Sequence, residues 1–67
     1  MKIIFYEIDV KQYNKRNNTK YVRVWIICSS DYCYMEGQRE NGFVDYLGIV
    51  DIKLFENMIR SVKLEDI

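Results

Sequence analysis

Three scarcities limit what this chain of 67 residues can do: it has no histidine, no proline and only two cysteines. Without histidine, the Ser-His and Cys-His pairs that activate a nucleophile cannot form. Two cysteines are too few for a disulfide framework and, within one chain, for a four-ligand zinc site. The sequence also lacks a glycine-rich phosphate loop. We therefore predict a protein that is not an enzyme and that uses no cofactor or metal.

Length and the few cysteines set the expected size and compartment. A chain this short holds one core, which predicts a single domain over residues 1–67. A bridge between Cys28 and Cys33 would close a very short loop, so both are expected as reduced thiols of a cytoplasmic protein. The apolar start of the chain meets Glu7 and Asp9 too early for a signal peptide. No apolar run approaches the roughly 20 residues of a membrane span, which predicts a soluble protein.

Charge is balanced over the whole chain but not along it. Ten basic residues match ten acidic ones, which gives a formal net charge of zero. The stretch from Val10 to Ser30 contains basic residues and no acid, whereas acids outnumber basic residues from Asp31 onward. A chain with opposite charge at its two ends can pair with copies of itself, so we expect a homo-oligomer.

Four segments have the alternating apolar pattern of β-strands. They are residues 2–10, 21–28, 32–40 and 43–49, although residues 30–36 could instead form a short helical turn. The polar run 14–20 predicts a hairpin loop between the first two strands. Asn41 and Gly42 predict a two-residue type I′ turn between the last two strands, because both positions of that turn need positive φ.

The last part of the chain has the pattern of an amphipathic helix. Asp51 is a suitable N-cap. The apolar residues after it recur at helical spacing, namely Ile52, Phe55, Ile59 and Val62. The predicted fold is therefore α+β, with a three- or four-stranded antiparallel sheet followed by one C-terminal amphipathic helix packed on one face.

The first two predicted strands carry apolar and aromatic side chains on both faces. One helix covers one face of a sheet, so the second face is expected to be open, and soluble monomers seldom expose a large apolar patch. Tyr, Trp and Arg also dominate the hot spots of protein interfaces. The predicted partner-binding residues are Phe5, Tyr21, Arg23, Trp25 and Ile27. The alternative is that the loops or the C-terminal tail fold over this face.

The polar run 14–20 offers a second candidate surface. Its Lys15, Arg16 and Lys20 precede aromatic residues in the next strand, and cations beside aromatic rings are the composition of a nucleic-acid surface. A net charge of zero argues against a dedicated nucleic-acid binder. Contact with phosphate or with an acidic partner is thus a secondary expectation for these three side chains.

The sequence predicts a small binding protein that self-associates and engages another protein. Its richness in Lys, Asn, Ile and Tyr suggests an AT-rich genome, which with the small size suits a phage or mobile-element inhibitor of a protein in the host cytoplasm. Anchoring by the aromatic face or edge-strand addition would be the mechanism. The alternatives are a nucleic-acid-binding module built on the basic run, and a binder of a nucleotide-like ligand at an oligomer interface.

Overall fold

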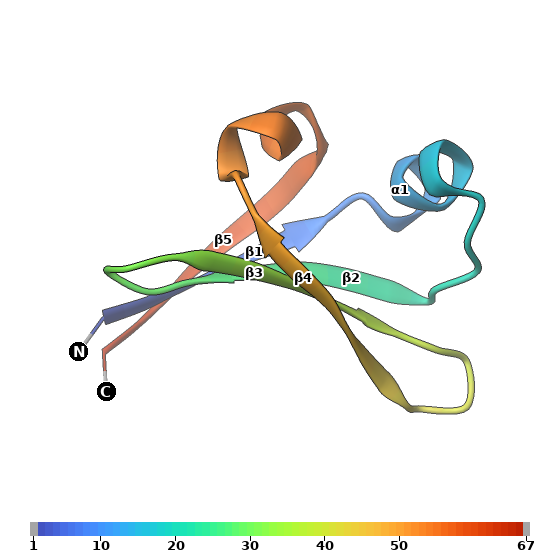
Figure 1. Cartoon of the computed structure of the whole chain (residues 1–67), viewed down its shortest axis with the longest axis horizontal. Coiled ribbons are helices and arrows are strands. Elements are labelled where there is room, and N and C mark those ends of the chain that lie inside the picture. The colour runs from blue at the N-terminus through green and yellow to red at the C-terminus, as the bar shows by residue number, and fades with distance from the viewer. Residues whose placement is uncertain (1, 67) are drawn as a thin grey trace.

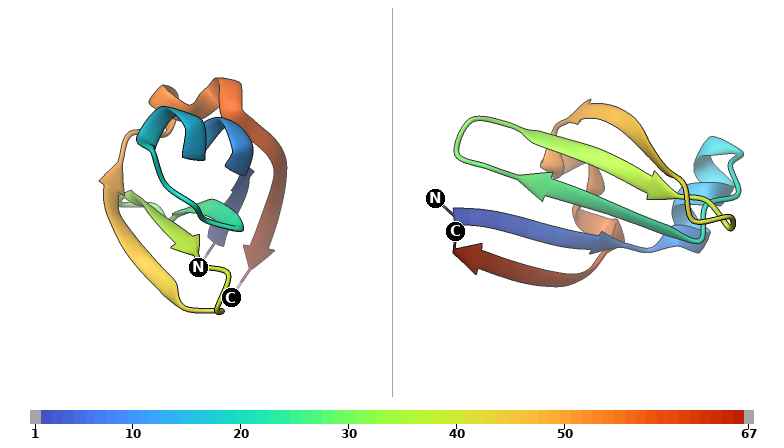
Figure 2. Two further views of the ribbon diagram at one scale, coloured as in Figure 1. Left: turned by 90° about the vertical axis from the view of Figure 1, so that its right-hand side faces the viewer. Right: turned by 90° about the horizontal axis from the view of Figure 1, so that it is seen from below.

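The computed structural model describes the backbone of residues 2–66 and the side chains of residues 2–65. It contains a five-stranded antiparallel sheet in the order β4-β3-β2-β1-β5 (Figure 1). The strands are β1 (Lys2–Ile8), β2 (Arg23–Cys28), β3 (Cys33–Gln38), β4 (Val44–Val50) and β5 (Ile59–Asp66). The helix α1 (Val10–Asn17) joins β1 to β2, and the 3-10 helix η1 (Ile52–Met58) joins β4 to β5. Both helical segments lie on the same side of the sheet (Figures 1 and 2).

The predicted arrangement of three or four strands followed by a C-terminal helix is wrong. A helical segment does begin after Asp51, whose side chain accepts a hydrogen bond from the backbone N–H of Lys53 at 3.0 Å. It ends at Met58, and residues 59–66 then pair with β1 as the antiparallel strand β5. Pairing with β5 satisfies backbone groups of β1 that would otherwise be exposed at an edge. Helical spacing in the sequence does not reveal that residues 59–66 can form these hydrogen bonds with β1.

Helix α1 lies where the end of a strand and a hairpin loop were predicted. Asp9 caps its N-terminus by accepting a hydrogen bond from the backbone N–H of Gln12 at 3.2 Å. Asn18 ends the helix in the left-handed conformation, at φ 55°. The side chain of Asn14 then ties residues 19–21 to the helix through three hydrogen bonds of 2.8 to 3.0 Å. The polar run is thus held by its own side chains as a helix with a short connection.

The β3–β4 hairpin differs from its prediction in turn type. Its turn spans residues 39–43, where the N–H of Gly42 donates to the carbonyl three residues earlier at 2.9 Å. Gly42 is at φ 93°, but its neighbour Asn41 is not at positive φ, so the turn is not type I′. Farther along β4, the register shifts by one residue next to Gly48, at φ 102°. This bulge places Tyr46 and Ile49 on the same face of the sheet, although three positions separate them.

The core lies between the sheet and the two helical segments. Its most deeply buried side chains are apolar and come from β1, β2, β3 and η1, namely Ile8, Val24, Ile26, Met35 and Met58. Tyr13 of α1 and Cys28 of β2 complete the set of buried residues. A core this small gives a low total free energy of unfolding, so each buried side chain contributes a large part of it.

The two cysteines form a disulfide, in contrast to the predicted reduced thiols. Cys28 ends β2 and Cys33 begins β3, and the antiparallel register places them directly opposite each other. Strand pairing brings the two Cα atoms to 4.1 Å, a proximity that spacing along the chain alone does not imply. The argument from free thiols to a cytoplasmic location therefore no longer holds.

A polar cluster links the start of β2 to the β3–β4 hairpin. Arg39 donates to both carboxylate oxygens of Asp45, at 2.8 and 2.9 Å, and the hydroxyl of Tyr21 donates to the same carboxylate at 3.0 Å. The hydrogen bonds from Arg39 hold the pKa of Asp45 below its ordinary value, against the desolvation that raises it. The folded protein therefore favours the charged form of this carboxyl.

Substitution of Asp45 by asparagine is expected to weaken the dependence of stability on acid pH. Because the pKa of Asp45 is lower in the folded chain, its contribution is complete above the ordinary value of 3.8 and is lost as the pH falls through the lowered value. Chemical unfolding between about pH 6 and about pH 2 measures this. Asp31→Asn, in the exposed turn before β3, is the matched control. An acid dependence of Asp45→Asn equal to that of the wild type contradicts the prediction.

Candidate functional site

The face of the sheet opposite the helical segments is left uncovered by the described part of the chain. Figure 2 (right) views the molecule from this side, with the strands in front of both helical segments. Two rows of directly opposed residues cross all five strands here. The first row is Ser61, Glu7, Trp25, Glu36 and Tyr46, and the second is Lys63, Phe5, Ile27, Tyr34 and Ile49. These two rows, together with Arg23, are called the open face below.

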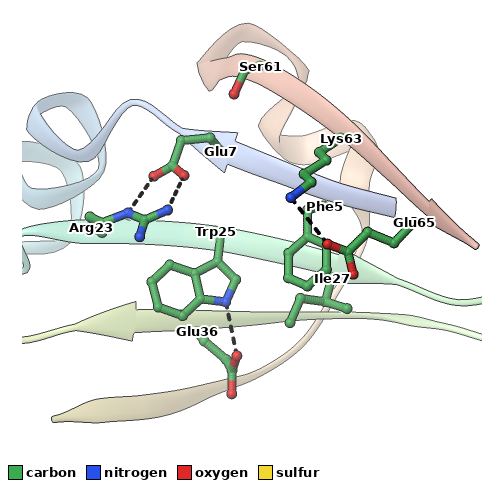
Figure 3. A pocket seen from close by; sticks show the side chains of 9 residues that line it. All are labelled: Phe5, Glu7, Arg23, Trp25, Ile27, Glu36, Ser61, Lys63 and Glu65. Atoms are coloured by element: carbon green, nitrogen blue, oxygen red, sulfur yellow. Dashed lines mark hydrogen bonds and ion pairs between the residues drawn. The ribbon is translucent and has the colours of Figure 1, made fainter. Parts of the chain in front are cut away.

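Trp25 lies near the centre of the open face, on the middle strand β2 (Figure 3). The guanidinium carbon of Arg23 is 5.3 Å from the centroid of the Trp25 ring. Arg23 also forms an ion pair with Glu7 at 2.7 Å, and hydrogen bonding to this carboxylate raises the pKa of the guanidinium. On the β3 side, the indole N–H donates to Glu36 at 2.9 Å. These contacts orient the indole ring before any partner binds, which lowers the entropic cost of binding.

The second row of the open face is mainly apolar and aromatic. Phe5 and Ile27 are directly opposed on β1 and β2, and their side chains lie together in Figure 3. On β3, the ring centroid of Tyr34 is 5.8 Å from that of Tyr46 in the first row. On the edge strand β4, Tyr46 is 62% exposed and Ile49 is 69% exposed. Soluble monomers seldom leave such a continuous apolar surface without a partner.

A hollow of about 520 Å³ lies on the open face around Trp25 (Figure 3). It is lined by the apolar Phe5, Trp25 and Ile27, by Ser61, and by the charged Glu7, Arg23, Glu36, Lys63 and Glu65. Arg23 pairs with Glu7, and Lys63 pairs with Glu65 at 3.3 Å. The hollow thus has two cations against three carboxylates, a net charge of one negative. Among the described residues, Glu36 has no cation within ion-pair distance.

The structure brings four of the five predicted partner-binding residues together on the open face, namely Phe5, Arg23, Trp25 and Ile27. Tyr21 lies elsewhere. It precedes β2, so the alternation of that strand does not govern its direction, and it packs against the core. A Cβ added to Gly37 would lie 2.8 Å from the Tyr21 ring, so only glycine leaves room for this packing. Tyr21 is therefore not part of the open face.

The three basic residues of the second candidate surface lie away from the open face. Lys15 and Arg16 are in the last turn of α1, Lys20 follows in the connection to β2, and all three are exposed. Helix α1 packs on the covered side of the sheet through Tyr13. The sheet therefore separates the cations of α1 from the aromatic side chain of Trp25. Lys15 and Arg16 therefore do not share a surface with Trp25.

Seven members of the open face were not among the predicted site residues, and four of these seven lie on β3 and β4. Tyr34 and Glu36 alternate with buried Met35 on β3, and this period-two pattern was visible in the sequence. Tyr46 and Ile49 could not be assigned to one face by alternation, because the bulge between them changes the register. The sequence thus contained a signal for the two residues on β3 but not for the pair on β4.

Comparison of the chain with protein-family models, with curated proteins and with solved structures found no match. In the described part of the chain, no helix is long and apolar enough to cross a membrane. Over the same residues, no group of three or more His, Cys, Asp or Glu side chains is placed to hold a metal ion.

Proposed function

We propose that this chain is a non-catalytic protein-binding domain that docks on a partner protein through the open face. The observation that carries the proposal is an oriented tryptophan at the centre of an aromatic sheet face that the described chain leaves uncovered. Trp, Tyr and Arg are enriched among the residues that contribute most to binding at protein interfaces. Trp25, Tyr46 and Arg23 place all three residue types on the open face. By occupying the partner's surface, such a domain acts as an inhibitor. A phage or mobile-element origin is the setting that the small size suits.

A phosphate-bearing ligand is less favoured than a protein. The hollow carries a net charge of one negative, and carboxylates repel phosphate. The exposed Lys15 and Arg16 belong to α1, on the far side of the sheet from Trp25. These two observations weigh against the nucleic-acid module and against a nucleotide-like ligand held by this face.

Edge-strand addition is a second mode by which the same partner could bind. Strands β4 and β5 are the edges of the sheet, and the open face continues onto β4 through Tyr46 and Ile49. A partner strand added to β4 would extend the sheet and cover both side chains.

Photo-crosslinking tests the proposal in extracts of the cells that encode the protein. A photoreactive benzoylphenylalanine replaces Tyr46 on the open face, and the control carries it in place of Leu54, which is 71% exposed on η1. We expect a light-dependent adduct with a single protein from the first position, which an excess of unlabelled wild-type protein suppresses. No such adduct, or equal adducts from both positions, contradicts the proposal.

Light scattering on the purified protein identifies the occupant of the open face. A monomer at all concentrations, together with a foreign protein in the adduct, supports docking on a partner. A stable dimer whose adduct has the mass of two copies would replace the foreign partner by a second copy of this chain.

A further inference from the structure

On the open face, Trp25 has a carboxylate on the β1 side and another on the β3 side, but only the carboxylate on the β1 side is paired with a guanidinium. On the β1 side, Arg23 lies over the indole ring and pairs with the carboxylate of Glu7, so that a guanidinium, a carboxylate and a ring are in contact (Figure 3). On the β3 side, Glu36 lies between Trp25 and Tyr46 in the same row of the sheet. A carboxylate and two rings are present there, but among the described residues no guanidinium forms an ion pair with this carboxylate.

The position of Glu36 leaves its carboxylate able to accept further donors. One oxygen accepts the hydrogen bond from the Trp25 indole at 2.9 Å, which holds the side chain in place. A carboxylate offers about four lone-pair positions, so most of its capacity is open to a partner. Aromatic rings lie beside this carboxylate. One is Tyr34, whose hydroxyl has a raised pKa, first because of burial and then because of the nearby charge of Glu36. The ring of Tyr46 next to it is mostly exposed.

We propose that Glu36 binds an arginine side chain of the partner protein, with the guanidinium paired to the carboxylate and stacked on the exposed ring of Tyr46. This inference rests on the proposed function and names the chemistry of the anchor. A planar guanidinium matches a carboxylate through two parallel hydrogen bonds and stacks on aromatic rings, which a lysine ammonium does not do. One added cation also neutralises the single negative charge of the hollow.

The apolar second row suggests what surrounds this arginine in the partner. Ile27 and Tyr34 lie beside Trp25 and Glu36, one row away on the same strands. A short peptide with an arginine between two leucines therefore presents the proposed anchor together with apolar groups for this row. The probe is acetyl-Leu-Arg-Leu-amide, and its neutral counterpart replaces the arginine by citrulline, which keeps the shape of the side chain and removes its charge.

The single tryptophan of the chain makes the site directly observable. The indole N–H that donates to Glu36 gives one ¹H–¹⁵N signal, which reports on Trp25 alone. We expect the arginine peptide to shift this signal in a saturable way, with a Kd about tenfold lower than that of the citrulline peptide. A third peptide, acetyl-Leu-Lys-Leu-amide, is expected to bind more weakly than the arginine peptide.

Glu36→Gln is the decisive variant, because glutamine keeps an oxygen that accepts from the Trp25 indole and removes only the charge. We expect this variant to bind the arginine and citrulline peptides equally, and Glu40→Gln, in the exposed turn, to behave as the wild type. An unchanged preference for arginine in Glu36→Gln, equal affinity of the wild type for arginine and lysine, or no saturable shift would overturn the inference. If the partner adduct at position 46 still forms in that case, the proposed function stands without the arginine anchor.

Discussion

Replacement of Ile26 by alanine is expected to leave most of the protein unfolded at room temperature. Ile26 is fully buried on the central strand β2, between Tyr6 of β1 and Met35 of β3. Truncation of a buried isoleucine costs about 2–5 kcal/mol, since the apolar burial is lost and a cavity remains. A core in a chain of this size rarely supplies more than about 3–5 kcal/mol in total, so the loss is comparable to the whole stability. Circular dichroism with urea titration measures it.

Ile49→Ala is the matched control for this prediction. It makes the same chemical change on a strand of the same sheet, but on the exposed side chain of the open face. We expect the free energy of unfolding to change by less than about 1 kcal/mol. Comparable losses in both variants would mean that burial on the covered side is not what holds the sheet together.

Replacement of Trp25 by alanine is expected to weaken partner binding strongly while the fold persists. Truncation removes the ring from the centre of the open face, together with the surface on which Arg23 stacks and the donor that orients Glu36. Loss of a central aromatic hot spot costs about 2–4 kcal/mol, which weakens binding by at least about 30-fold. Calorimetric titration with the partner identified by cross-linking gives the affinity, and circular dichroism verifies the fold.

Leu54→Ala serves as the control for Trp25→Ala, because it removes an exposed apolar side chain from the covered side of the sheet. Its affinity for the partner is expected to equal that of the wild type. Trp25→Phe keeps a ring but no indole N–H, and an intermediate affinity is expected. Full partner affinity in a folded Trp25→Ala protein would remove the open face as the binding surface.

Four strands lie close to their predicted bounds, and the reason is local. Alternation with a period of two depends on neighbouring residues alone, so it survives whatever else the chain does. The same alternation put Phe5, Trp25 and Ile27 on one face before any pairing was known. It failed for Tyr21, which lies outside the strand, and it could not place Tyr46 and Ile49 on one face, because a bulge lies between them.

Helix α1, predicted as a loop, and strand β5, predicted as part of a helix, were mispredicted for two different reasons. For α1, the prediction of a loop rested on the polar composition of residues 14–20 and took no account of Asp9, which caps the helix by accepting from the Gln12 N–H. For β5, helical spacing and strand alternation coexist in residues 59–65, and no local rule decides between them. The available edge of β1, far away in the sequence, decided in favour of the strand.

Local side-chain pattern was therefore enough to define the first four strands, the aromatic character of one face and the absence of histidine chemistry. Contacts between distant segments decided the rest: the fifth strand, the opposition of Cys28 and Cys33, and the row that joins Trp25, Glu36 and Tyr46. These features depend on register and on which edge is free. Both are properties of paired strands, and no single stretch of sequence contains them.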